Sequence, residues 1–193
     1  LVNSEFYADA MSDFLQLPRE KFRIVPLGID TRDFREPPKR PDRPPTIGYL
    51  ARLAPEKGLH VLVDAFLRLK QMPDMQATRL EIAGWLGPQH REYAEAQFAR
   101  LRDAGLGDAF RYHGEVNRAQ KLDFLRSLDV LSVPTTYREP KGLFVLEALA
   151  AGVPVVQPAH GAFPEVLEAT GGGVLVPPND PEQLALALHQ LLI

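Results

Sequence analysis

The chain contains no cysteine, which excludes disulfide bonds, thiolate metal sites and a cysteine nucleophile. No apolar run reaches the roughly 18 residues expected of a membrane-spanning helix, and the N-terminus has no signal-peptide pattern. The formal net charge of −3 provides no general attraction to nucleic acid or to an anionic membrane. We therefore expect a cytoplasmic globular protein that binds no nucleic acid and has no transmembrane segment. Peripheral attachment of a longer protein to a membrane remains an alternative.

From residue 46 onward, short apolar runs alternate with helical patterns. Strands are expected at Thr46–Ala51, Leu80–Gly84, Phe110–His113, Val130–Pro134, Val153–Gln157 and Gly173–Val176. The helices that follow them are expected at Gly58–Lys70, Gln89–Ala104, Arg118–Leu128, Leu143–Ala151, Phe163–Ala169 and Pro181–Leu192. Six β-α units of this kind predict an α/β fold, a Rossmann-like doubly wound parallel sheet of about six strands with helices on both faces. Ligands of such sheets bind at the carboxyl ends of the strands.

The most informative stretch is residues 139–156, which read EPKGLFVLEALAAGVPVV. Glu147 is the one charge inside its apolar part, and a buried carboxylate needs a partner or a function. Glu139 precedes a proline and is expected in an extended loop, and Gly142 then opens the helix. Because helical side chains lean towards the N-terminus, both carboxylates can approach a helix end whose free N–H groups favour a phosphate. A nucleotide sugar, with phosphate and hydroxyl groups, suits this arrangement.

The E-x7-E spacing of Glu139 and Glu147, followed by A-L-A-A-G-V-P-V-V, resembles the signature of the retaining GT-B glycosyltransferases of family 4 (glycosyl transferases group 1). That group includes sucrose and glycogen synthases. The loop after the first strand, with Arg52 and Lys57 before Gly58, resembles the R-x-x-x-x-K-G of the same family. The spacing alone also fits a core helix with one salt-bridged glutamate, so the whole run in this order carries the resemblance.

The resemblance implies a division of the chain into three parts. Residues 1–36, with an expected helix over residues 4–17 and a short strand over residues 21–26, form the tail of an N-terminal acceptor-binding domain. Residues 37–45 contain five prolines and form a stiff linker with solvated basic residues. Residues 46–193 form the nucleotide-sugar-binding, C-terminal half of a GT-B fold. The chain starts without Met and stops within an apolar helix, so we expect a piece of a longer protein.

The resemblance also implies a reaction, the retaining transfer of a hexosyl group from a nucleotide diphosphate sugar to an acceptor hydroxyl. This chain would supply the donor site, and the missing domain would bind a carbohydrate, lipid or glycan acceptor. We therefore expect the chain alone to bind the donor without transferring the sugar. A non-catalytic GT-B-like nucleotide-binding module and a nucleotide-sugar epimerase remain alternatives. A dinucleotide-binding domain is disfavoured because the first β-α loop lacks G-x-G-x-x-G.

Three residues are carried over as catalytic. Arg52 and Lys57 would grip the donor diphosphate and stabilise the leaving group, and Glu139 would contact hydroxyls of the donor sugar. Glu147 would hold the ribose hydroxyls. Plainer roles stay open, because Arg52 and Lys57 can be solvated loop cations, Glu139 can be a solvated loop residue, and Glu147 can pair with a cation such as Arg52.

The remaining donor-binding residues follow Glu139. The backbone N–H groups of Gly142 and Leu143 would face the distal phosphate. Lys141 stands where the family most often has an aromatic residue, so it either adds a cation beside the phosphates or points to solvent. Trp85 could stack on a ligand, but a lone Trp is more often a packing residue. Glu165, in a sequence that resembles the family's G-x-P-E, is interpreted as structural.

No D-x-D sequence occurs in the chain, and no pair of its five histidines has the spacing of metal ligands. A metal-dependent glycosyltransferase of the other main architecture normally uses D-x-D to hold its cation. Arg52, Lys57 and a helix N-terminus could supply the positive charge instead. We therefore predict no metal and no cofactor other than the donor itself.

Overall fold

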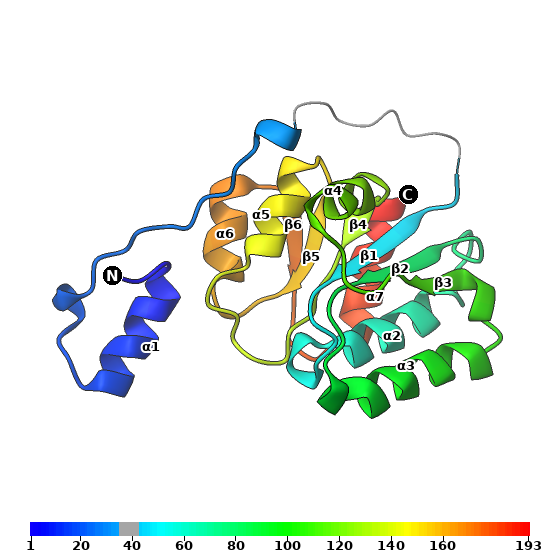
Figure 1. Cartoon of the computed structure of the whole chain (residues 1–193), viewed down its shortest axis with the longest axis horizontal. Helices are drawn as coiled ribbons and strands as arrows, with labels where there is room; N and C mark the ends of the chain where they lie inside the picture. The colour runs from blue at the N-terminus through cyan, green and yellow to red at the C-terminus, as the bar shows by residue number, and fades with distance from the viewer. Residues whose placement is uncertain (35–42) are drawn as a thin grey trace.

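The computed structural model describes residues 1–34 and 43–193 and contains one parallel six-stranded sheet in the order β3-β2-β1-β4-β5-β6 (Figure 1). The strands are β1 (Thr46–Leu50), β2 (Arg79–Ala83), β3 (Phe110–Tyr112), β4 (Val130–Leu131), β5 (Val155–Pro158) and β6 (Gly173–Val176). The chain runs outward from β1 to one edge, returns to the centre at β4, and continues to the other edge. This order confirms the predicted doubly wound sheet.

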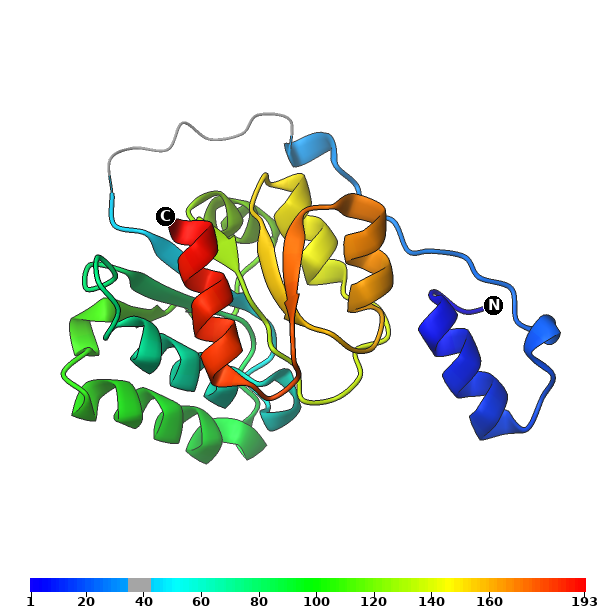
Figure 2. The same cartoon turned by 180° about the vertical axis from the view of Figure 1, so that it is seen from behind.

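Helices cover both faces of the sheet (Figures 1 and 2). One face carries α2 (Leu59–Leu69), α3 (Arg91–Asp103) and α7 (Pro181–Leu192), and the other carries α4 (Arg118–Arg126), α5 (Leu143–Ala150) and α6 (Phe163–Thr170). Short 3-10 helices lie at Arg19–Lys21 (η1), Arg32–Phe34 (η2), Pro55–Lys57 (η3), Pro88–His90 (η4) and Gly107–Ala109 (η5). Figure 2 shows α7 beside α2, so the last helix returns to the centre of the sheet.

The hydrophobic core explains why β1 is central. All five residues of β1 are buried, because helices cover it on both faces. Behind it, α2 presents a continuous apolar stripe at helical spacing, with Leu62, Phe66 and Leu69 fully buried. The apolar periodicity in the sequence therefore places these side chains in the hydrophobic core.

The N-terminal segment contacts α4, α6 and the loop before α5, and α1 (Glu5–Leu15) projects away from the sheet (Figure 1). Ser4 caps α1 by accepting a hydrogen bond from the Tyr7 N–H (3.1 Å), and its hydroxyl donates to the carbonyl of Pro140 (3.3 Å). The carboxylate of Glu165 accepts hydrogen bonds from the N–H groups of Glu5 (2.8 Å) and Phe6 (2.7 Å). A carboxylate at a helix N-terminus is favourable, so Glu165 has the structural role expected of it.

We expect Glu165→Ala to loosen this junction. The N–H groups of Glu5 and Phe6 would lose their acceptor, and their hydrogen exchange should accelerate by roughly tenfold or more, given about 0.5–2 kcal/mol for a helix cap. Glu168→Ala, at an exposed position of the same helix, is the matched control and should leave the exchange unchanged. Equal protection of both amides in the two variants would show that Glu165 does not hold α1.

Two predictions for the first 45 residues were wrong. The strand expected over residues 21–26 is absent, because residues 19–21 form η1 and, among the described residues, only Ile24 of this segment pairs, in an isolated bridge with Val2.

The linker prediction lies largely outside the described residues, which resume at Arg43. The basic residues of the linker were expected to be solvated, but Arg43 donates to Asp129 Oδ2 at 2.9 Å, with side chains only 24% and 19% exposed. The division into three parts stays a prediction.

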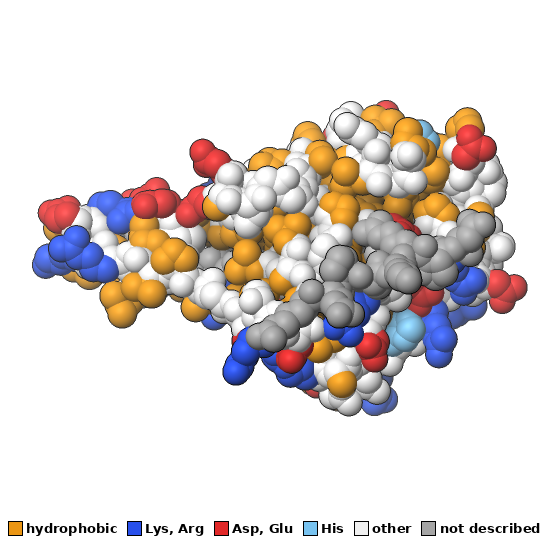
Figure 3. Space-filling model, turned by 90° about the horizontal axis from the view of Figure 1, so that it is seen from above, with side chains coloured by type: hydrophobic (Ala, Val, Ile, Leu, Met, Phe, Trp, Pro, Cys, Tyr) orange, Lys and Arg blue, Asp and Glu red, His pale blue; other side chains and the backbone are white. Residues whose placement is uncertain are grey.

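Apolar side chains are exposed on the projecting segment, which the space-filling view shows to one side of the domain (Figure 3). The clearest case is at and just after the end of α1, at Phe14, Leu15 and Leu17, and Phe14 is 78% exposed.

Within residues 1–34 and 43–193, no helix has the length and hydropathy that a membrane crossing requires.

Candidate functional site

Three loops meet at the carboxyl ends of β1, β4 and β5, and two glycines make their contact possible. Gly58 follows η3 with φ of +74°, and a Cβ atom there would lie 1.8 Å from the carbonyl oxygen of Pro134. Gly161 has φ of +62°, and its Cβ would lie 2.4 Å from the carbonyl oxygen of Glu139. Only glycine allows both the left-handed backbone and these distances. The loops that carry Lys57, Glu139 and α5 are therefore fixed against one another.

Lys57 and Glu139, which lie far apart in the sequence, form an ion pair between these loops. Lys57 Nζ lies 2.7 Å from Glu139 Oε2, and the two side chains are only 12% and 7% exposed. The hydroxyl of Tyr137 completes the group, 2.7 Å from Lys57 Nζ and hydrogen-bonded to the same carboxylate oxygen. The ammonium also lies 4.8 Å from the ring centroid of Tyr137 and 5.9 Å from that of Phe144. We call Lys57, Tyr137 and Glu139 the loop triad.

The other oxygen of Glu139 faces the start of α5. Oε1 accepts long hydrogen bonds from the N–H groups of Lys141 (3.2 Å) and Gly142 (3.4 Å). Among the described residues, the N–H groups of Leu143 and Phe144 in the first turn of α5 find no acceptor. Burial alone would raise the pKa of Glu139. The hydrogen bonds from Lys57 and Tyr137, together with the charge of Lys57, outweigh burial and hold the pKa below its ordinary value. Glu139 is therefore ionised, and free N–H donors lie beside it.

Glu147 is held by a residue that the sequence did not point to. Its carboxylate forms an ion pair with Lys121 of α4, and the side chains are 20% and 26% exposed. Arg52, the cation named as a possible partner, pairs instead with Glu56 at 3.4 Å. That suggestion was wrong because α4 packs beside α5 and brings a closer cation. Glu147 is thus half-buried and ionically paired, as a charge within an apolar helix requires.

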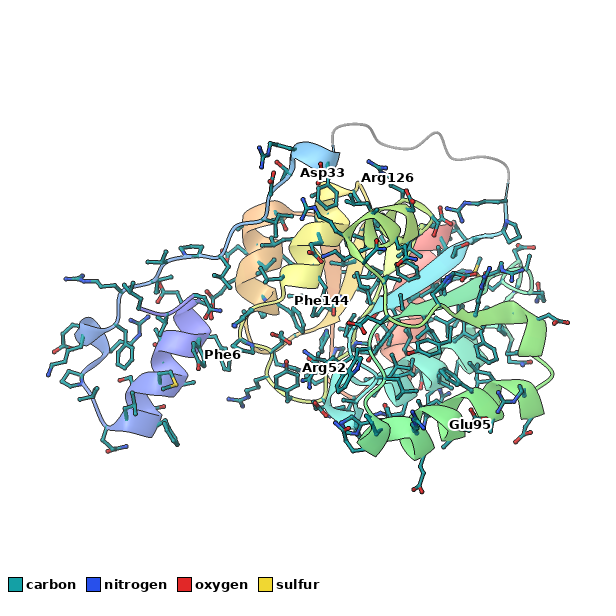
Figure 4. All side chains as sticks on the ribbon, in the orientation of Figure 1. Phe6, Asp33, Arg52, Glu95, Arg126 and Phe144 are labelled. Carbon is teal, nitrogen blue, oxygen red and sulfur yellow. The ribbon has the colours of Figure 1, made fainter. Side chains whose placement is uncertain are left out.

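Arg52 does not join the loop triad in this structure. It lies in the loop after β1 (labelled in Figure 4), its side chain is 55% exposed, and its contact with Glu56 is an exposed i,i+4 pair of small energetic value. Its guanidinium is free to move towards a ligand. In the conformation observed, the interpretation as a solvated loop cation fits Arg52, whereas it does not fit Lys57.

The remaining predicted site residues lie around the start of α5. Gly142 is buried with φ of +66°, and Leu143 is 36% exposed. Of the two N–H groups expected to face the phosphate, that of Gly142 donates to Glu139 Oε1 in this structure, and that of Leu143 has no acceptor among the described residues. Lys141 is exposed, and it lines a cavity of about 350 Å³ between the N-terminal segment and α6, together with Asn3, Leu27 and Glu165. Its side chain therefore lies near the junction with the N-terminal segment. Trp85 is 41% exposed in the loop after β2, where no stacking partner among the described residues contacts it.

The described part of the chain brings no three His, Asp or Glu side chains together as a metal-binding group. The absence of a metal from the reaction stays a prediction.

Sequence reasoning missed Tyr137 and Lys121, the partners of the two carboxylates. Tyr137 lies only two residues before Glu139, and its nearness was the one signal that could have suggested it.

Comparison with known protein families decides the family. The model of the family Glycosyl transferases group 1 matches residues 30–193, most of the chain. This chain belongs to that family. The putative colanic acid biosynthesis glycosyltransferase WcaL of Escherichia coli is 35% identical over 89% of this chain and 42% of its own length. A phosphatidyl-myo-inositol mannosyltransferase of Mycobacterium tuberculosis is 34% identical over 88% of this chain and 43% of its length.

Solved structures share the fold. Alr3699/HepE of Anabaena, crystallised with UDP and glucose, superposes with a TM-score of 0.81 at 22% identity and covers 98% of this chain and 52% of its own. The C-terminal domain of LpcC, a glycosyl transferase group 1 protein of Francisella tularensis, has a TM-score of 0.73 at 24% identity and covers 85% of this chain and 87% of its own. The fold is therefore that of a GT-B C-terminal domain. The chain spans less than half of the length of the two relatives above.

Proposed function

We propose that this chain is the donor-binding half of a retaining glycosyltransferase of family 4. The complete enzyme would transfer a hexosyl group from a nucleotide diphosphate sugar to an acceptor hydroxyl. The observation that carries the proposal is the position of the Lys57 ammonium, which is held in a largely buried ion pair next to the unpartnered N–H groups of Leu143 and Phe144. A cation and a helix N-terminus together suit a diphosphate. The acceptor would bind outside this chain, in the rest of the longer protein.

The chemistry proposed for this site is stabilisation of a leaving diphosphate. Breaking the glycosidic bond of the donor places negative charge on the distal phosphate, and preorganised donors stabilise that charge more in the transition state than in the substrate. Lys57 would supply a charged N–H group, the start of α5 would supply two backbone N–H groups, and Arg52 could swing in from solvent. The phosphate would in turn help to deprotonate the acceptor hydroxyl on the same face of the sugar, which gives retention.

Glu139 can take part without breaking its ion pair. Oε2 is committed to Lys57 and Tyr137, whereas Oε1 holds only the two long hydrogen bonds at 3.2 and 3.4 Å. A sugar hydroxyl can replace those weak bonds at small energetic cost. We therefore assign Oε1 to the donor sugar and Oε2 to the positioning of Lys57. Glu147, paired with Lys121, would accept from the ribose hydroxyls with its remaining lone pairs.

Two related proteins support the ligand class without settling its details. Alr3699/HepE was crystallised with UDP and glucose, and the M. tuberculosis relative is described as a mannosyltransferase. Both descriptions belong to those proteins. They are consistent with a hexose donor here and leave the base open, so the test must compare several nucleotides.

Titration calorimetry of the chain with UDP, GDP and ADP tests the proposal. We expect one diphosphate to bind, and Glu147→Ala to weaken that binding by roughly tenfold, as loss of a hydrogen bond to a charged group predicts. Lys21→Ala, which removes an exposed cation from η1, is the control and should bind as the wild type does. A folded chain that binds none of the three nucleotides would contradict the proposal. A non-catalytic module or an epimerase would bind the nucleotide while the longer protein fails to transfer the sugar.

A further inference from the structure

Tyr137 is a residue of the candidate site that the family resemblance does not include. It lies in the loop after β4, and its hydroxyl contacts both members of the buried ion pair, Lys57 Nζ at 2.7 Å and Glu139 Oε2. The ring is half-buried, and its centroid lies 4.8 Å from the ammonium. The hydroxyl thus contacts the cation and the carboxylate of the pair at the same time.

Counting protons fixes the direction of each hydrogen bond in the loop triad. Glu139 is ionised and has none, so the single phenolic proton of Tyr137 must go to Glu139 Oε2. The phenolic oxygen then accepts from Lys57. Burial, together with the adjacent carboxylate, raises the pKa of Tyr137 well above its ordinary value, so the phenol keeps this proton. Lys57 therefore uses two of its three N–H groups, one for each acceptor, and the third is left over.

We propose that Tyr137 is a positioning residue, whose hydroxyl holds the Lys57 ammonium and the Glu139 carboxylate so that the third N–H of Lys57 faces the donor diphosphate. The proposal rests on the proposed function, because it assigns a direction to a group in that same site. A lysine side chain has four rotatable bonds, and an ion pair alone constrains its ammonium weakly. A second, neutral acceptor at a fixed angle removes most of that freedom before the ligand arrives.

The proposal predicts a pH dependence with a definite sign. The charged and titratable groups around the pair come from three loops. They are Arg52 in the loop before η3, Glu56 and Lys57 in η3 itself, Arg138 and Lys141 on either side of Glu139, and His160 in the loop after β5, whose ring bonds the Thr135 carbonyl. The Tyr137 hydroxyl is one of the two side-chain donors that lower the pKa of Glu139. Without that hydroxyl the pKa of Glu139 rises, so Glu139 is protonated, and diphosphate binding is lost, at a higher pH than in the wild type.

The test compares Tyr137→Phe, which keeps the ring and removes the hydroxyl, with Tyr7→Phe, the same change on α1. UDP, GDP and ADP are titrated into each protein across a pH series. We expect Tyr137→Phe to bind about tenfold more weakly, as loss of one hydrogen bond to a charged group predicts, with its acid limb displaced to higher pH. Tyr7→Phe should match the wild type.

Two outcomes separate this inference from the proposed function. If the wild type binds a diphosphate and Tyr137→Phe binds equally well with the same pH profile, the positioning role is wrong and the proposed function stands. If no nucleotide binds to the wild type, both are wrong. A carboxyl-carbon NMR titration of Glu139 reports on the triad without a ligand, and an unchanged Glu139 pKa in Tyr137→Phe would also overturn the positioning role.

Discussion

Lys57→Ala is expected to destabilise the fold by roughly 3–5 kcal/mol and to abolish diphosphate binding. The carboxylate of Glu139 is only 7% exposed, so removing Lys57 leaves a buried charge without its cation. Tyr137 and two backbone N–H groups would remain as neutral partners, and they do not replace a positive charge. Chemical denaturation measures the change in the free energy of unfolding, and calorimetry measures the loss of binding.

A double variant separates the two effects of Lys57→Ala. In Lys57→Met combined with Glu139→Gln, both charges are removed, so most of the lost stability should return because no unpaired charge is buried. Binding should not return, because the cation that faces the diphosphate is still missing. Wild-type stability of Lys57→Ala would show that the ion pair is not buried in solution. Restored binding in the double variant would show that Lys57 does not contact the ligand.

Gly58→Ala is the second change with a large expected effect, a destabilisation of roughly 3–5 kcal/mol. A Cβ atom at Gly58 would lie 1.8 Å from the carbonyl oxygen of Pro134, and the backbone there has φ of +74°. The backbone atoms cannot overlap in this way, so the loop before α2 must move away from the loop after β4. That movement separates Lys57 from Glu139, and we expect diphosphate binding to be lost together with stability.

Gly171→Ala is the matched control for this variant. Gly171 ends α6 with φ of +67°, close to the value at Gly58, but nothing lies within 4 Å of a Cβ atom there. Only the left-handed backbone is penalised, by roughly 1–2 kcal/mol. Thermal or denaturant unfolding of both variants therefore isolates the cost of the clash with Pro134. Equal destabilisation of the two variants would contradict the close contact between the loops.

The fold of the domain could be predicted from the sequence because its signals are local. Apolar runs such as Thr46–Leu50 and the helical stripe of α2 recur in regular alternation, and alternating strands and helices allow few topologies. The strand expected at residues 21–26 failed for the opposite reason. A strand needs a neighbour, and among the described residues only Val2 pairs with this segment, through Ile24. A short stretch of sequence alone does not reveal whether a neighbour exists.

The candidate site was predicted only in part, because its pairings depend on how loops and helices meet in space. The order of motifs placed Lys57 and Glu139 at one end of the sheet, and the structure brings them together. Lys121 was missed because it lies on a different helix from Glu147, and no spacing along the chain reports that contact. Arg52 was grouped with Lys57 by its position in the loop, yet its side chain turns to Glu56 and solvent.

Two-dimensional NMR of the chain during titration with UDP, and separately with GDP, tests the central claim most directly. The claim is that the diphosphate binds at the start of α5 beside Lys57. We therefore predict large shifts of the Leu143 and Phe144 backbone amides and of the Lys57 side chain, saturating together with one nucleotide. Saturable binding that leaves these three groups unmoved and shifts residues elsewhere in the chain would contradict the account.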